Sequence, residues 1–134
     1  MTQEDKNLLL QDLCARLPYK IRCSYYDICL SAHCNGEIYG IENKEYAIVD
    51  GRCVAIEFIK PYLFPLSSMS EEQKVEYDKM CELDIEYTIT QIKNNSTIWT
   101  TGLNRFNWFL KNHFDVYGLI PMGLAIDCTN LNIY

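Results

Sequence analysis

The chain has 134 residues, of which 49% are hydrophobic and 22% charged, a composition typical of globular proteins that excludes a disordered chain, a collagen and a long coiled coil. This length suits one domain of about 100–200 residues, so we expect residues 1–134 to form a single domain. Twelve basic and 18 acidic residues give a net charge of −6, which disfavours direct binding to nucleic acid or to an anionic membrane surface.

The compartment is predicted from the absence of sorting signals. No apolar run approaches the roughly 20 residues that span a bilayer. The polar, acidic start at residues 1–6 is unlike the basic start of a signal peptide. We therefore expect a cytosolic protein whose seven cysteines are free thiols in a reducing compartment.

The first predicted element is a helix that begins after Thr2 and ends near Leu17. Thr2 can cap the first turn with its hydroxyl. Leu9, Leu13 and Leu17 recur every four residues and form an apolar stripe of helical period. Pro18 disfavours helical geometry at the residue before it and so ends the helix.

Residues 20–58 change to an alternating pattern that predicts an antiparallel meander of four or five strands. Asn35-Gly36 and Asp50-Gly51 are its predicted hairpin turns, because both dipeptides tolerate positive φ at the two central turn positions. The following residues 60–66 are bracketed by two prolines. This segment is predicted to be extended, with its aromatic side chains inserted in the core, but not to be a central strand.

A second helix is predicted from Glu71 to about Leu83, because Ser70 and Gln73 form a capping box at its start. Its expected buried stripe consists of Tyr77, Met80 and Cys81. Residues 85–92 alternate again and predict a strand, and Asn94-Asn95 predicts a turn into a short strand at residues 97–99.

The third predicted helix spans residues 102–112, with Leu103, Phe106 and Leu110 on its core stripe. The fold class is therefore α+β: a small antiparallel β-meander of four to six strands packed with about three helices. We expect the two later helices to pack on one face of the sheet.

Chemical motifs are few. Cys29, His33 and Cys34 lie close together, but zinc sites have a second pair of ligands that is missing here, so no metal and no other cofactor is predicted. The chain has no phosphate-binding glycine loop and no nucleophile elbow. An enzyme that uses Cys29 or Cys34 with His33 stays open as a minor alternative.

Acidic residues concentrate in the second helix. Residues 71–86 carry seven acids against Lys74 and Lys79. This acidic face either is simply solvated or docks on a basic partner, and the candidate binding residues are Glu72, Glu76, Asp78 and Glu82.

Aromatic residues concentrate around the third helix. Trp108 falls roughly opposite Phe106 and Leu110 on that helix, close to Arg105 and His113. An exposed tryptophan beside basic side chains is typical of an interface hot spot. Alternatively, Trp108 packs under the C-terminal tail.

Several stretches carry a resemblance, namely residues 12–19, 62–73, 112–115, 118–120 and 123–127. Together they resemble small uncharacterised proteins encoded in phages and prophages of gut Bacteroidales bacteria. Residues 21–58 and 83–100 depart from that pattern. The resemblance implies a cytosolic, phage-related setting without a defined activity, and no catalytic residue is carried over from it.

The leading hypothesis is a non-enzymatic, phage-related binding protein that acts on a host or phage protein, as in counter-defence. It would act through the acidic helix face and the exposed aromatics. The alternative is a small-molecule binder, such as a sponge for a nucleotide signal, in which Arg22, Arg52 or Arg105 faces a pocket. The oligomeric state stays open.

Overall fold

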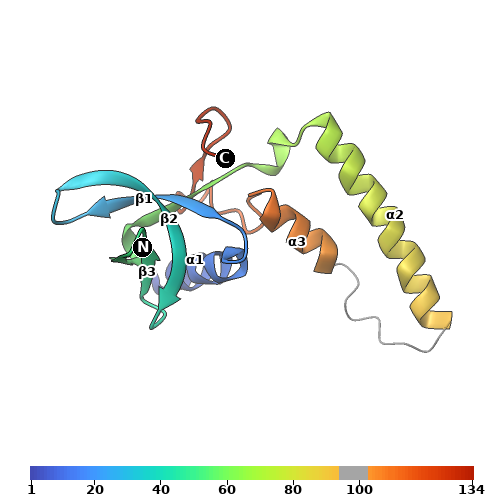
Figure 1. Cartoon of the computed structure of the whole chain (residues 1–134), viewed down its shortest axis with the longest axis horizontal. Coiled ribbons are helices and arrows are strands. Elements are labelled where there is room, and N and C mark those ends of the chain that lie inside the picture. The colour runs from blue at the N-terminus through green and yellow to red at the C-terminus, as the bar shows by residue number, and fades with distance from the viewer. Residues whose placement is uncertain (94–102) are drawn as a thin grey trace.

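The computed structural model describes residues 1–93 and 103–134, except for the side chains of residues 83–93 and 103 (Figure 1). Within these ranges it has three α-helices and a six-stranded sheet, which confirms the α+β class. The elements in chain order are α1 (Gln3–Arg16), β1 (Ile21–Asp27), β2 (Ala32–Glu42), β3 (Tyr46–Val49), β4 (Arg52–Ala55), the 3₁₀ turn η1 (Ile56–Phe58), β5 (Ile59–Leu63), η2 (Leu66–Ser68), α2 (Glu71–Lys93), α3 (Leu103–Lys111) and β6 (Ile126–Asp127).

The sheet has the order β4-β3-β2-β1-β5-β6. Strands β1 to β4 form the predicted antiparallel meander. The chain then passes through η1, and β5 pairs antiparallel with β1 on the far side of the meander. The short strand β6 is parallel to β5. The strand β4 is therefore an edge of the sheet.

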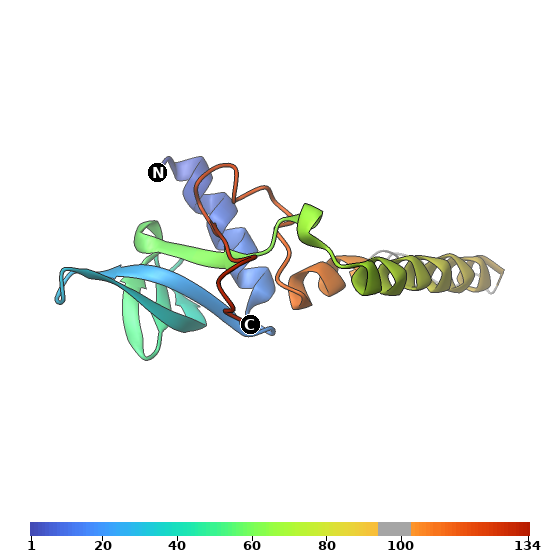
Figure 2. The ribbon, with the colours of Figure 1, turned by 90° about the horizontal axis from the view of Figure 1, so that it is seen from above.

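Helix α1 covers one face of the sheet, as seen from above in Figure 2. Thr2 and Asp5 form a capping box at its start, and the helix ends at Arg16, next to the predicted stop. Leu9 and Leu13 are fully buried against the sheet. In β1 every second residue is buried, so Cys23 faces the core. The burial of Leu9 and of Leu13 stabilises the fold by about 1.5–3 kcal/mol each.

One of the two predicted hairpin turns is confirmed. Asp50 and Gly51 have φ of 48° and 83°, and the flanking residues Val49 and Arg52 pair directly. The other prediction is wrong, because Asn35 and Gly36 lie inside β2 and the chain turns instead at residues 28–31 and 43–45. Gly36 allows β2 to lie close to the side chains of Val49 and Asp50, because a Cβ at position 36 would lie 2.6 Å from Val49 Cγ1 and 2.6 Å from Asp50 Oδ2.

The proline-bracketed segment is extended, and Tyr62 is buried as expected, together with Leu63, whereas the other aromatic residue, Phe64, is half-buried. However, β5 is paired on both sides, which corrects its predicted exclusion from the middle of the sheet. It pairs with β1 through residues 59–61 and with β6 from Tyr62 onward. Pairing with β6 thus begins after Pro61, the residue that has no N–H to donate.

Helix α2 begins with the predicted capping box, in which the Gln73 amide donates to Ser70 Oγ at 3.1 Å and the Ser70 amide donates to Gln73 Oε1 at 2.9 Å. The strand predicted at residues 85–92 is wrong, because the helix continues to Lys93. Ile85, Ile89 and Ile92 recur at i, i+4 and i+7, which is helical spacing, whereas an alternating strand would place Ile92 on the opposite face from the other two.

The later helices do not both lie on the sheet, contrary to expectation. Figures 1 and 2 show α2 extending away from the sheet, with its first turns beside α3. Helix α3 lies between α2 and α1. The predicted turn at residues 94–95, the strand at 97–99 and Trp99 lie outside the described residues. In the described part of the chain, no helix is long and apolar enough to cross a membrane.

Candidate functional site

The acidic residues of α2 up to Glu82, the last one whose side chain the structure describes, are exposed. Glu72, Asp78 and Glu82 lie at the surface of a helix that extends into solvent. Glu76 is exposed too, but its Oε1 accepts a hydrogen bond of 3.1 Å from Trp108 Nε1. The candidate acidic face is therefore present, and one of its four members also holds α2 to α3.

The predicted exposure of Trp108 is wrong, because its side chain is buried. Its ring stacks on Phe114 at a centroid distance of 5.8 Å and lies 5.6 Å from Tyr77 of α2. The cover of Trp108 is thus Tyr77 of α2 and Phe114, which belongs to the C-terminal segment after α3, so the second interpretation is confirmed in part. Arg105 is half-buried beside Tyr77.

His113 is also covered. It has a left-handed φ of 62°, and its ring stacks under that of Tyr134 with centroids 3.5 Å apart. The hydroxyl of Tyr134 accepts from the Arg22 amide and donates to the Tyr62 carbonyl, each at 3.0 Å. Burial, and then the charge of Arg16, lowers the pKa of His113 to about 4. Trp108 and His113 therefore do not form the expected surface hot spot.

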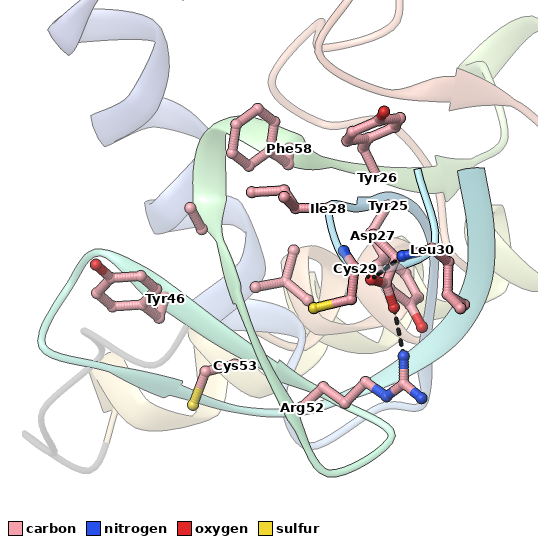
Figure 3. A pocket seen from close by; sticks show the side chains of 12 residues that line it. Tyr25, Tyr26, Asp27, Ile28, Cys29, Leu30, Tyr46, Arg52, Cys53 and Phe58 are labelled. Atoms are coloured by element: carbon pink, nitrogen blue, oxygen red, sulfur yellow. Dashed lines mark hydrogen bonds and ion pairs between the residues drawn. The ribbon is translucent and has the colours of Figure 1, made fainter. Parts of the chain in front are cut away.

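A different site lies beside the edge strand β4. We call it the β4 groove: a cavity of about 550 Å³ lined by residues 25–30, Tyr46, residues 52–55 and Phe58. Its walls are the end of β1 with the turn after it, the strand β4 and the 3₁₀ turn η1 (Figure 3). Binding sites for ligands are commonly concave and mostly apolar, with a few fixed polar groups.

Asp27 organises one wall of the β4 groove. Its Oδ1 accepts hydrogen bonds from the amides of Cys29 at 2.9 Å and Leu30 at 3.1 Å, which fixes the turn between β1 and β2. Its Oδ2 forms an ion pair with Nη1 of Arg52. This pair ties the end of β1 to the start of β4, as the dashed line in Figure 3 shows.

The rim of the β4 groove is unusually apolar for a surface. Ile28 is 68% exposed and Leu30 is 60% exposed, both on the turn after β1. Tyr46 of β3 and Phe58 of η1 are 42% and 39% exposed. Single exposed apolar side chains are ordinary, but a contiguous apolar patch around a cavity marks an interaction site.

Sequence reasoning singled out Arg52 for a pocket and Cys29 as a candidate nucleophile, but it missed the other residues of this groove. The misplaced turn at Asn35-Gly36 put Ile28 and Leu30 inside a predicted strand, where alternate apolar side chains face the core. One signal was available: Asp commonly begins an Asx turn, because its carboxylate accepts a hydrogen bond from the backbone amide two residues later, and Asp27 begins one here.

Cys29 and His33, which the enzyme alternative would pair, line different cavities. Cys29 lines the β4 groove, whereas His33 lines a second cavity of about 340 Å³ together with Ser24 and Lys60. Each shifted thiol pKa among the described residues is raised: burial raises that of Cys23 to about 12 and that of Cys128 to about 11, and a hydrogen bond to Glu42 raises that of Cys53. A nucleophilic thiol needs a lowered pKa, so these three cysteines are poor nucleophiles.

All seven cysteines are free thiols. Within residues 1–93 and 103–134, no group of three or more His, Cys, Asp and Glu side chains has the arrangement of a metal site.

Comparison of the chain with known protein families, curated proteins and solved structures finds no match.

Proposed function

We propose that this chain is a non-enzymatic binding protein and that the β4 groove receives a protein partner. The observation that carries the proposal is the ring of exposed apolar side chains around a 550 Å³ cavity whose wall is fixed by the Asp27–Arg52 ion pair. Apolar anchors that enter a preformed pocket supply most of the affinity in protein interfaces, because they are fully desolvated there. The proposed role is the binding role predicted from the sequence, but the proposed contact site is the β4 groove and not Trp108.

The acidic face of α2 has a secondary part in the proposal. Glu72, Asp78 and Glu82 are exposed, and the chain has a net charge of −6. Exposed like charges attract a basic partner over a distance of about one Debye length and raise the rate of encounter more than the final affinity. The partner is therefore expected to be basic near its contact with this chain.

The proposed setting rests on the resemblance of the sequence. The resemblance to phage and prophage proteins makes a host or phage protein the proposed partner, with counter-defence as the proposed role. The proposed compartment is the host cytosol, where seven free thiols stay reduced.

The nucleotide-sponge alternative is less well supported by the groove. Arg52 is the cation that lines the groove, and its charge is already matched by Asp27. A phosphate would have to compete with that carboxylate for the guanidinium. The exposed aliphatic side chains Ile28 and Leu30 contribute nothing specific to an anion.

The test places a photo-crosslinking phenylalanine analogue at position 58 or, as a control, at position 131 of the chain expressed in a gut Bacteroidales host. Leu131 is 49% exposed and does not line the groove. We expect a discrete protein adduct from position 58 alone. Ile28→Asp in the same chain should abolish the adduct, and Leu131→Asp should leave it unchanged.

Two results would overturn the proposal. The first is an adduct that forms equally from position 131 or survives Ile28→Asp, because the groove would then not be the contact. The second is stabilisation of the purified chain by cyclic nucleotides that is lost in Arg52→Ala, which would favour the small-molecule alternative.

A further inference from the structure

The free edge of β4 offers unused backbone groups. Val49 and Arg52 flank a two-residue turn, so they form a hydrogen-bonded pair, and the pattern then alternates along the antiparallel strands. The Ile56 amide donates to the Glu45 carbonyl at 2.9 Å, which fits this alternation. Residues 52, 54 and 56 therefore point their backbone groups toward β3, whereas Cys53 and Ala55 point theirs away from the sheet.

In the described part of the chain, β4 pairs only with β3. The N–H and C=O of Cys53 and the N–H of Ala55 are thus left for a neighbour. The Ala55 carbonyl is not among these free groups, because Ala55 is the N-cap residue of the 3₁₀ turn η1. Unpaired backbone groups on an edge strand are a ready template for another strand.

These groups adjoin the β4 groove. Cys53 and Ala55 line the groove, and the turn after β1 carries Ile28 on another wall, near Phe58 of η1 (Figure 3). A chain lying along the groove therefore meets a row of backbone donors and acceptors on one side and apolar side chains on the other. This combination is that of strand addition, in which main-chain hydrogen bonds give affinity and pockets select alternate side chains.

We infer that the β4 groove binds an extended segment of the partner that pairs with β4 as a seventh strand of the sheet; this inference rests on the proposed function. The partner residue opposite Val54 shares the face of that side chain, which is buried in the core. An aliphatic or aromatic side chain at this position extends the apolar face between β4 and the turn after β1.

The charge around β4 specifies what flanks that apolar residue. Residues 42–57 carry four exposed carboxylates, those of Glu42, Glu45, Asp50 and Glu57. The same stretch has two cations, Lys44 and Arg52, and the second is paired with Asp27. Charge complementarity therefore favours lysine or arginine on both sides of the apolar residue, and the inferred occupant is an apolar segment with basic flanks.

The test uses short random peptides selected for binding to the purified whole chain. Selected peptides should have apolar residues at alternate positions and Lys or Arg beside them. Cys53→Pro removes the outward N–H without breaking the ladder to β3, because edge strands tolerate proline where the N–H faces away. Cys53→Ala is the matched control, since it removes the thiol and keeps the N–H.

We expect Cys53→Pro to weaken binding of the selected peptide by about tenfold or more, because a hydrogen bond is lost and the ring obstructs the added strand. Cys53→Ala should bind within about twofold of the natural chain, as expected for a surface change. Circular dichroism and the thermal midpoint report whether Cys53→Pro is folded. If it is not, a peptide N-methylated at the residue opposite Cys53 replaces it, and one methylated at the next residue is its control.

The outcomes separate the inference from the proposed function. If Ile28→Asp abolishes peptide binding while Cys53→Pro and the methylated peptide leave it intact, the groove binds but strand addition is wrong. If neither Ile28→Asp nor Cys53→Pro affects binding, the β4 groove is not the binding site and the proposed function is wrong as well. Recovery of no peptide overturns the inference. So does a self-association of the chain that Cys53→Pro abolishes, because the strand beside β4 would then come from a second copy.

Discussion

Arg16 and Asp12 form a fully buried ion pair one turn apart on α1. The Nε and Nη2 of Arg16 donate to the two carboxylate oxygens at 2.7 and 2.8 Å, and Nη2 also donates to the Phe114 carbonyl at 2.6 Å. Both side chains have no exposed surface. The pair thus connects the helix that covers the sheet with the segment after α3.

We predict that Arg16→Met lowers the free energy of unfolding by about 3–5 kcal/mol, because it leaves the Asp12 carboxylate buried without its partner. Burial already raises the pKa of Asp12 in the presence of the guanidinium. The double variant Asp12→Leu/Arg16→Met should recover much of the loss, since no charge then remains buried. Urea unfolding followed by circular dichroism measures both, and equal losses in the single and double variants would contradict this account.

The second prediction concerns acid stability and His113. Burial, and then the charge of Arg16, lowers the pKa of His113 from 6.5 to about 4 in the folded chain. The unfolded chain therefore binds this proton at higher pH than the folded chain does. The stability contributed by the neutral imidazole is complete above pH 6.5 and is lost as the pH falls toward 4.

His113→Asn tests that dependence, because asparagine tolerates the left-handed φ of 62° at this position. We expect the natural chain to lose more stability than the variant as the pH is lowered through this interval. Hydrogen bonds lower the pKa values of Asp5 and Asp127. Both residues are present in the natural chain and in the variant, so their contributions to the pH dependence cancel in the difference. Parallel curves of stability against pH would show that the imidazole does not titrate in this way.

The elements that the sequence predicted correctly have signals in adjacent residues. Thr2 and Asp5 cap α1, Ser70 and Gln73 cap α2, and Asp50-Gly51 forms a two-residue turn. Each signal acts through a hydrogen bond or a φ value within four residues, so its meaning does not depend on the rest of the fold. These features fix where elements begin, but they do not say what covers them.

The sequence predictions are wrong where burial or the position of a side chain depends on segments that are distant in the sequence. Trp108 lies off the apolar stripe of α3 and is buried because a second helix, α2, supplies Tyr77 and Glu76. The β4 groove needs β4 and the end of β1 to lie together, and that placement depends on the strand order. No local pattern encodes the ion pair between Asp27 and Arg52, which are 25 residues apart.

The third prediction tests how α2 is attached to α3. Glu76→Ala removes the acceptor of the Trp108 indole N–H and should lower the free energy of unfolding by about 1 kcal/mol. Glu82→Ala makes the same chemical change at an exposed position of the same helix and should alter stability by less than about 0.5 kcal/mol. Chemical denaturation of the two variants decides the matter, and indistinguishable curves would mean that the hydrogen bond contributes nothing.

The last prediction concerns the two glycines of β2, which differ in the space around them. A Cβ at Gly36 would meet Val49 Cγ1 and Asp50 Oδ2 at 2.6 Å, whereas one at Gly40 would lie 3.7 Å from Ile48 Cδ1, an ordinary contact. Gly36→Ala should therefore cost about 1–3 kcal/mol through overpacking against β3 and its turn. Gly40→Ala should be neutral or slightly stabilising, because alanine loses less backbone entropy than glycine on folding. Thermal unfolding of the pair measures the contrast, and a Gly36→Ala variant as stable as Gly40→Ala would show that β2 and β3 are not packed this closely.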